Sequence, residues 1–111
     1  MPLFRAWLTA FALTVLSELA IAVPLLRAGG PRPRRVAAVC LAQLATHPSV
    51  WFIWPLLELP RPVFLSLAEA WALVVEALIY RFSFERIAWS RCFAASAFAN
   101  AGSLFLGLWL R

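Results

Sequence analysis

Charged residues are scarce in this sequence, where they make up 14% of 111 residues. Soluble domains carry about 25%, so this chain has too little polar surface to cover a globule in water. Lysine and aspartate are absent, and the net charge of +5 comes from ten Arg and five Glu. In a soluble protein this balance would suggest a nucleic-acid partner. Here the arginines lie mostly between apolar runs, which favours membrane orientation and contact with anionic lipid, and no nucleic acid.

Residues and motifs of familiar catalytic and metal sites are also few. Cys40 and Cys92 do not form a Cys-x-x-Cys pair, which excludes zinc-ribbon and thioredoxin-like motifs. His47 is the only histidine, so one chain cannot build a multi-histidine iron or haem site. The sequence contains no Gly-x-Ser-x-Gly, no His-Glu-x-x-His and no phosphate-binding loop. An enzyme is therefore not favoured, and an intramembrane metalloenzyme is kept as an alternative.

The sequence has instead long apolar stretches, with 64% hydrophobic residues and a mean hydropathy of +0.85. Four apolar runs cover residues 6–26, 36–57, 63–80 and 87–110. A helix of about 20 residues crosses the hydrocarbon core of a bilayer. We therefore predict one domain over residues 1–111, an all-α integral membrane protein. Its four transmembrane helices would form an up-down-up-down antiparallel bundle, since short links make sequential helices neighbours.

The first run has a second interpretation, a cleaved signal peptide. Arg5 precedes it, and Ala20-Ile21-Ala22 resembles a cleavage site. The run continues to residue 26, however, and more arginines follow it than precede it. These two features favour a membrane-spanning helix.

The arginines are distributed unevenly between the two ends of the expected bundle. The links at 27–35 and 81–86 hold most of them, namely Arg27, Arg32, Arg34, Arg35, Arg81 and Arg86. The opposite end receives Arg5, Arg61 and Arg111. Since basic residues are enriched in cytoplasmic loops, we expect both links in the cytoplasm and both termini outside. We expect the membrane to be a bacterial inner membrane.

Each expected helix carries a stripe of polar residues at membrane depth. A polar group in hydrocarbon needs a partner, and ionisable ones there are functional candidates. Four facing stripes would give a polar interior and an apolar, lipid-facing exterior. The strongest candidates for ion or proton binding are Glu18, His47, Glu69, Glu76 and Asn100.

Two kinds of site fit these candidates. Imidazole and carboxylate together suit a divalent metal, and a mononuclear metal site would use His47, Glu69 and Glu18. A proton relay also fits, because a buried carboxyl group tends to keep its proton and imidazole titrates near neutral pH. Glu69 and Glu76 are two turns apart, about 10.5 Å along a helix. This spacing favours a ladder of protonatable groups over a single metal ion.

Three further features each have a structural interpretation. Glu76 could form a structural ion pair with Arg91, which lies at a similar depth. Pro48 directly follows His47 and could either kink the second helix or expose backbone carbonyls to an ion. Small residues recur every fourth position in the last helix and allow close helix packing within the chain or in a homodimer; they are Ala95, Ala99, Ser103 and Gly107.

The length, the four expected helices and Glu18 in the first one resemble the architecture of the small multidrug-resistance exporters. Carboxylates in the third helix and a mid-membrane His47-Pro48 are not part of that family's pattern, so no residue role is carried over from it.

From these observations we expect a small multi-pass membrane protein that binds and moves a cation, by proton-linked or divalent-metal transport. The main alternative is a structural or assembly subunit of a larger membrane complex, in which the polar stripes hold helices together.

Overall fold

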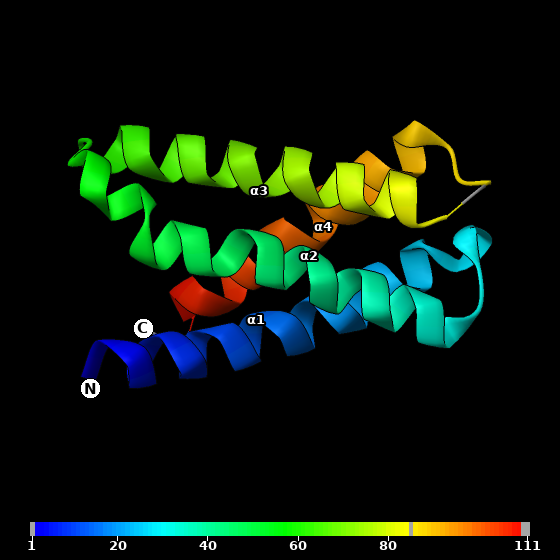
Figure 1. Ribbon diagram of the computed structural model, residues 1–111, viewed down its shortest axis with the longest axis horizontal. Coiled ribbons are helices and arrows are strands. Elements are labelled where there is room, and N and C mark those ends of the chain that lie inside the picture. Colours follow the sequence, from blue (N-terminus) through cyan, green and yellow to red (C-terminus); the bar gives the residue numbers. More distant parts are fainter. Residues whose placement is uncertain (1, 85, 110–111) are drawn as a thin grey trace.

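The computed structural model describes residues 2–84 and 86–109, which form four long helices (Figure 1). They are α1 (Pro2–Leu25), α2 (Arg32–Phe52), α3 (Arg61–Ser83) and α4 (Trp89–Trp109). Short 3-10 turns follow α1 and α2, at Arg27–Gly29 (η1) and Trp54–Leu57 (η2). All four helices are long and apolar enough to cross a membrane. The predicted fold class is therefore confirmed.

Prolines fix most of the helix boundaries. Pro31 and Pro60 precede α2 and α3, and each helix has a further proline in its first turn, where the missing N–H group costs nothing.

The second run was expected to be helical to residue 57, but α2 ends at Phe52 and residues 54–57 form the tighter turn. Pro55 cannot donate a backbone hydrogen bond, and Glu58 has a left-handed backbone with φ 52°. Both features end the regular helix early.

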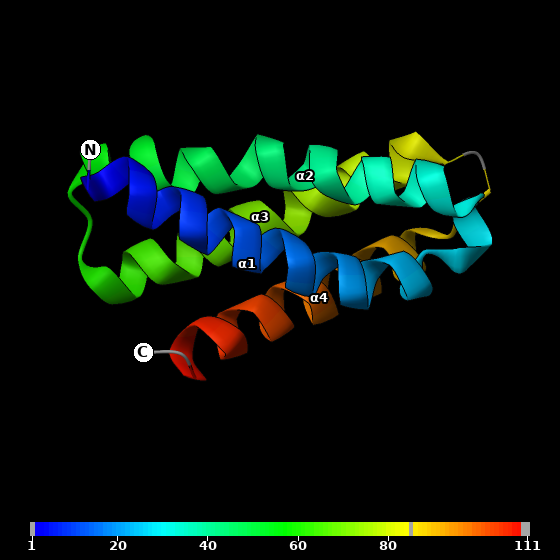
Figure 2. The same ribbon diagram turned by 90° about the horizontal axis from the view of Figure 1, so that it is seen from below.

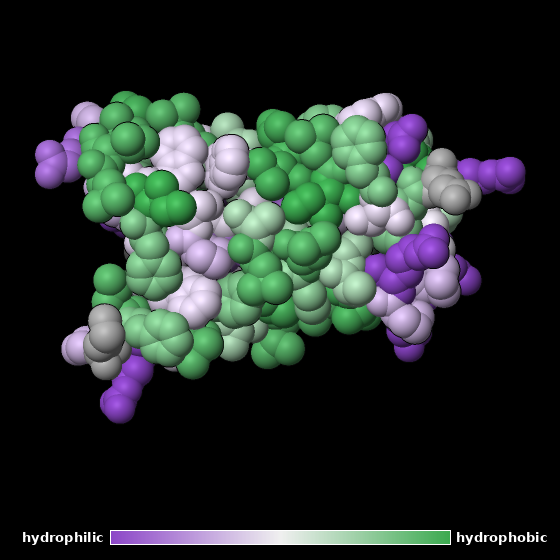
Figure 3. Space-filling model, viewed as in Figure 1, coloured by the Kyte–Doolittle hydropathy of each residue, from purple (hydrophilic) through white to green (hydrophobic). Residues whose placement is uncertain are grey.

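The helices form an antiparallel bundle in which each contacts two neighbours. α1 packs against α2 and α4, and α3 packs against the same two helices (Figures 1 and 2). Both termini and η2 lie at one end, which we call the terminus-side end. η1 and the link from α3 to α4 lie at the other, the loop-side end. Hydrophilic residues gather at both ends and a hydrophobic band lies between them (Figure 3).

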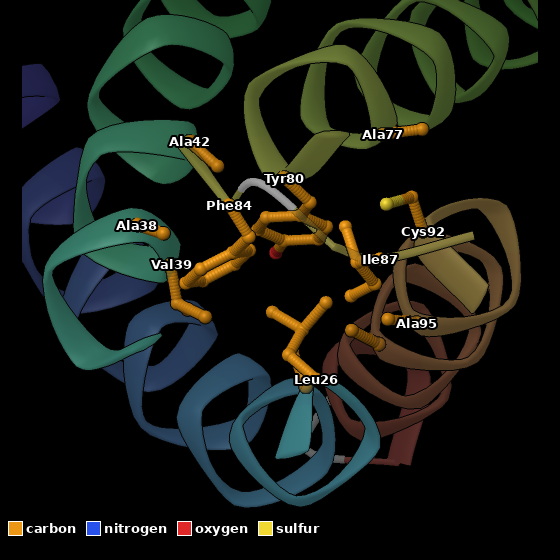
Figure 4. Packing of buried hydrophobic residues seen from close by; sticks show 12 residues of the cluster. Leu26, Ala38, Val39, Ala42, Ala77, Tyr80, Phe84, Ile87, Cys92 and Ala95 are labelled. Carbon is orange, nitrogen blue, oxygen red and sulfur yellow. The ribbon is translucent and has the colours of Figure 1, made fainter. Parts of the chain in front are cut away.

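The loop-side end is filled by apolar side chains. Leu26, Val39, Phe84 and Ile87 surround Tyr80, and all five are at most 5% exposed (Figure 4). We call this cluster the apolar plug.

The connection after α1 is packed tightly against the apolar plug. A Cβ atom on Gly29 would lie 2.7 Å from Cγ of Phe84, so only glycine allows the backbone this close. Arg35 holds the same connection, since its guanidinium donates to the carbonyl oxygens of Val23 at 2.6 Å and Gly30 at 3.0 Å.

The terminus-side end is less tightly packed. A Cβ atom on Gly102 would collide with the side chain of Ile21, whereas one on Gly107 would meet no described atom within 4 Å. α1 and α4 therefore diverge toward this end, as Figure 2 shows. A cleft of about 440 Å³ separates them there, lined by Ala6, Ala10 and Leu106 among others.

Candidate functional site

A cavity of about 250 Å³ lies between the four helices in the terminus-side half of the bundle. It extends from Arg61, which is exposed at the first turn of α3, to Glu76, the 16th of the 23 residues of that helix. Four of the five predicted site residues line it, namely His47, Glu69, Glu76 and Asn100. Polar side chains from the expected stripes therefore face this part of the interior, and the cavity reaches the terminus-side end at Arg61, while the apolar plug fills the loop-side end.

Glu76 lies at the inner end of this cavity with 1% of its surface exposed. One carboxyl oxygen, Oε1, accepts a hydrogen bond from Nδ2 of Asn100 at 3.0 Å. The other, Oε2, lies 3.0 Å from Oγ1 of Thr46. Both carboxyl oxygens are thus paired with uncharged groups from the two helices that flank α3.

The hydroxyl of Thr46 decides which form of Glu76 this site suits. Oγ1 of Thr46 lies 3.0 Å from the carbonyl oxygen of Ala42 as well as 3.0 Å from Oε2 of Glu76. A hydroxyl group has one proton to donate, so it cannot serve both acceptors fully. A protonated Glu76 removes this conflict, since it donates from Oε2 to Thr46 while Thr46 donates to Ala42. The geometry therefore fits a neutral carboxylic acid at Glu76.

Asn100 is fixed by further bonds within α4 and reaches α3 through Ser96. Its Nδ2 donates to the carbonyl oxygen of Ser96 at 2.8 Å, and Oγ of Ser96 donates to the carbonyl oxygen of Leu73 at 2.8 Å. Oγ of Ser103 donates to the carbonyl oxygen of Asn100. The amide that contacts Glu76 is thus held in place by its own helix.

Glu18 lies behind the cavity wall and does not line it. Its side chain is 0% exposed, and within residues 2–84 and 86–109 neither carboxyl oxygen has a hydrogen-bond partner. Nε2 of Gln43 and the hydroxyl of Tyr80 are likewise buried without a partner in the described part of the chain. Glu18 is the 17th of 24 residues in α1 and Glu76 the 16th of 23 in α3, and both helices run toward the loop-side end, so the two carboxyl groups lie at a similar depth. We call Glu18 and Glu76 the carboxyl layer.

His47 and Glu69 form the outer part of the cavity. Glu69 is half-buried, and His47 is packed among aromatic rings. The centroid of its ring lies 5.5 Å from that of Phe11, 6.1 Å from Trp51 and 6.4 Å from Trp7. His47 is therefore part of an aromatic cluster between α1 and α2, with only part of its ring facing the cavity.

The expected metal site is not assembled. No three His, Cys, Asp or Glu side chains among the described residues lie close enough together to hold a metal ion. His47 and Glu69 share the cavity, but Glu18 is separated from it by the cavity wall. The reason is depth, since Glu18 lies in the loop-side half of α1, whereas His47 lies in the terminus-side half of the antiparallel α2.

The expected ion pair between Glu76 and Arg91 is not formed either. Both oxygens of Glu76 are bonded to Thr46 and Asn100, and the side chain of Arg91 is exposed. Cys92, Ala95, Ser96 and Ala99 form the inner face of α4, and Arg91 lies outside that face.

Two further expectations concerned Pro48 in α2 and the small-residue series in α4. α2 continues as a helix through Pro48 to Phe52, which agrees with a tolerated proline. Ala95 and Ala99 of the small-residue series are buried in the bundle's own core, whereas Ser103 and Gly107 line the cavity. The homodimer stays a prediction.

Sequence reasoning missed Thr46. Thr46 lies three residues after Gln43 and thirty before Glu76, so only the packing of α2 on α3 reveals the contact. No family model, curated protein or solved structure matches the chain.

Proposed function

We propose that this protein binds protons at the carboxyl layer and moves them across the membrane. The observation that carries the proposal is the pairing of Glu76, a buried carboxyl group at the end of an open cavity. Its partners Thr46 and Asn100 pair both oxygens of the protonated acid. Glu69 lies two turns nearer the mouth on the same helix and would exchange protons with the solvent there.

A proton is favoured over a divalent metal for two reasons. The described residues do not gather three metal-ligating side chains, and divalent cations need several ligands at once. A proton needs only one basic oxygen at a time, and Glu69 is followed two turns deeper on the same helix by Glu76, with Glu18 at the depth of Glu76.

The arginines indicate which end of the bundle would face the cytoplasm. Arg27, Arg32, Arg34 and Arg86 are exposed at the loop-side end, which we propose is cytoplasmic in a bacterial inner membrane. The cavity would then open to the outside and the apolar plug would face the cytoplasm.

A proton-flux assay with reconstituted protein tests the proposal. Purified protein is placed in liposomes that contain a pH-sensitive dye, and a membrane potential is applied through a potassium gradient and valinomycin. We expect faster acidification than in empty liposomes, and a return to the empty-liposome rate with Glu76→Gln. Glu58→Gln is the matched control, because Glu58 is exposed in the turn between α2 and α3.

Two results would contradict the proposal. Wild-type flux from a folded Glu76→Gln protein would remove Glu76 from the path. Folded wild-type protein that acidifies liposomes no faster than empty ones would favour the alternative of an assembly subunit.

A further inference from the structure

The face of α3 that carries the cavity carboxylates continues into the apolar plug. Residues 69, 76 and 80 are seven and four positions apart, which places them along one face of the helix. Tyr80 lies one turn beyond Glu76 toward the loop-side end. It is therefore the next polar side chain after the carboxyl layer on a path through the bundle.

The hydroxyl group of Tyr80 has no structural explanation. The side chain is 0% exposed, and its oxygen has no hydrogen-bond partner among residues 2–84 and 86–109. Figure 4 shows this oxygen pointing between Leu26, Phe84 and Ile87. A phenylalanine would fill the same space without burying a hydroxyl, and buried polar groups without a partner are costly and uncommon.

The groups around this hydroxyl connect it to the carboxyl layer. Among the described residues, the titratable side chains that interact electrostatically with it are Glu76 on α3, Glu18 on α1 and Cys92 on α4. α2 contributes Val39 and Ala42 to the same cluster, neither of which titrates. Both proton-binding carboxyl groups thus lie on the cavity side of Tyr80, and apolar side chains lie on its loop side.

Phe84 separates Tyr80 from the loop-side solvent. It is 3% exposed and follows the last residue of α3, where the backbone becomes extended. Its ring packs against the backbone of Gly29, which belongs to the connection after α1. Arg35 holds this connection against α1 through a hydrogen bond to the carbonyl oxygen of Val23. The barrier between Tyr80 and the loop-side solvent thus consists of the Phe84 ring and the short connection after α1. A small movement of either would admit water to Tyr80.

We propose that the hydroxyl of Tyr80 passes protons between the carboxyl layer and the loop-side solvent, and that Phe84 is the gate that controls water access to it. This inference rests on the proposed function. The phenol oxygen has no hydrogen-bond partner among the described residues, so in the transfer the acid proton of Glu76 or Glu18 passes to an intervening water molecule. That water gives a proton to the phenol oxygen as the original hydroxyl proton leaves to a water molecule on the loop side. The carboxylate that remains is protonated again from the cavity.

Tyr80→Phe tests the hydroxyl in the same liposome assay. It removes one oxygen atom and keeps the ring, so the plug stays filled. We expect proton flux to fall by about a hundredfold or more, as is typical when a positioned proton-transfer group is lost. Wild-type flux that is abolished by Glu76→Gln but unchanged by Tyr80→Phe would overturn this inference and leave the proposed function standing. Absence of wild-type flux would instead overturn the proposed function.

Phe84→Ala tests the gate, with Phe82→Ala as the matched control because Phe82 is 77% exposed. The reporter is the native Cys92, which is buried beside the plug (Figure 4), in a Cys40→Ser background. In nanodiscs, we expect a polar maleimide to label Cys92 in Phe84→Ala and to leave it unlabelled in the wild type and in Phe82→Ala. Equal protection of Cys92 in all three proteins would show that Phe84 is not the gate.

Discussion

Replacing Glu76 by Gln and by Ala distinguishes a protonated side chain from an ionised one. Gln has the shape of the carboxylic acid, and its amide can donate to Thr46 while its carbonyl oxygen accepts from Asn100. If Glu76 is protonated in the folded protein, Glu76→Gln keeps both hydrogen bonds and changes the free energy of unfolding by less than about 0.5 kcal/mol. If Glu76 is ionised, two bonds to a charged group are weakened, each worth about 1.5–3 kcal/mol.

Glu76→Ala shows how much unfolding free energy is lost when the side chain is removed altogether. It removes two side-chain hydrogen bonds, each worth about 0.6 kcal/mol in a membrane protein, and leaves a void that adds about 2 kcal/mol. We therefore expect a loss of about 3 kcal/mol for Ala and almost none for Gln. The assay is unfolding by SDS in mixed micelles, followed by tryptophan fluorescence. A Gln variant that is as unstable as the Ala variant would refute the protonated form.

Two further predictions concern packing. Gly29→Ala should destabilise the protein by about 1–3 kcal/mol, because the new methyl group would overlap the ring of Phe84. Gly107→Ala should be neutral or stabilising, since nothing lies within 4 Å of the added methyl group and alanine favours a helix. The same unfolding assay compares them, and equal losses would contradict the packing described at Gly29. His47→Phe should keep or raise the stability, because the ring packs in an aromatic cluster and Nδ1 is buried without a partner in the described chain. A clear loss of stability would show that the imidazole has a partner.

The helices were predictable from the sequence because hydrocarbon thickness fixes the length of an apolar run. The inner face of each helix was also largely predictable, since polar residues at spacings of three and four mark it. Glu76 and Asn100 were placed on such stripes, and the structure directs both inward, where they bond to each other.

The pairing of residues between helices was not predictable in the same way. It depends on the depth and rotation of each helix to within about one turn, and polar stripes do not fix either. Glu76 was assigned to Arg91 because their depths matched, but Arg91 lies off the inner face of α4. His47, Glu69 and Glu18 were assigned to one metal, although Glu18 does not line the cavity that His47 and Glu69 share. Thr46 carries no charge, so it was not among the predicted site residues.

Infrared spectroscopy in lipid bilayers can show whether the carboxyl layer holds protons in the folded protein, as we propose. The chain contains five Glu and no Asp, so few groups contribute to the spectrum. At neutral pH we expect a carboxylic-acid C=O band that shifts in deuterated buffer, and we expect Glu76→Gln to remove part of it while Glu58→Gln leaves it unchanged. A wild-type spectrum with carboxylate bands and no carboxylic-acid band would contradict the account.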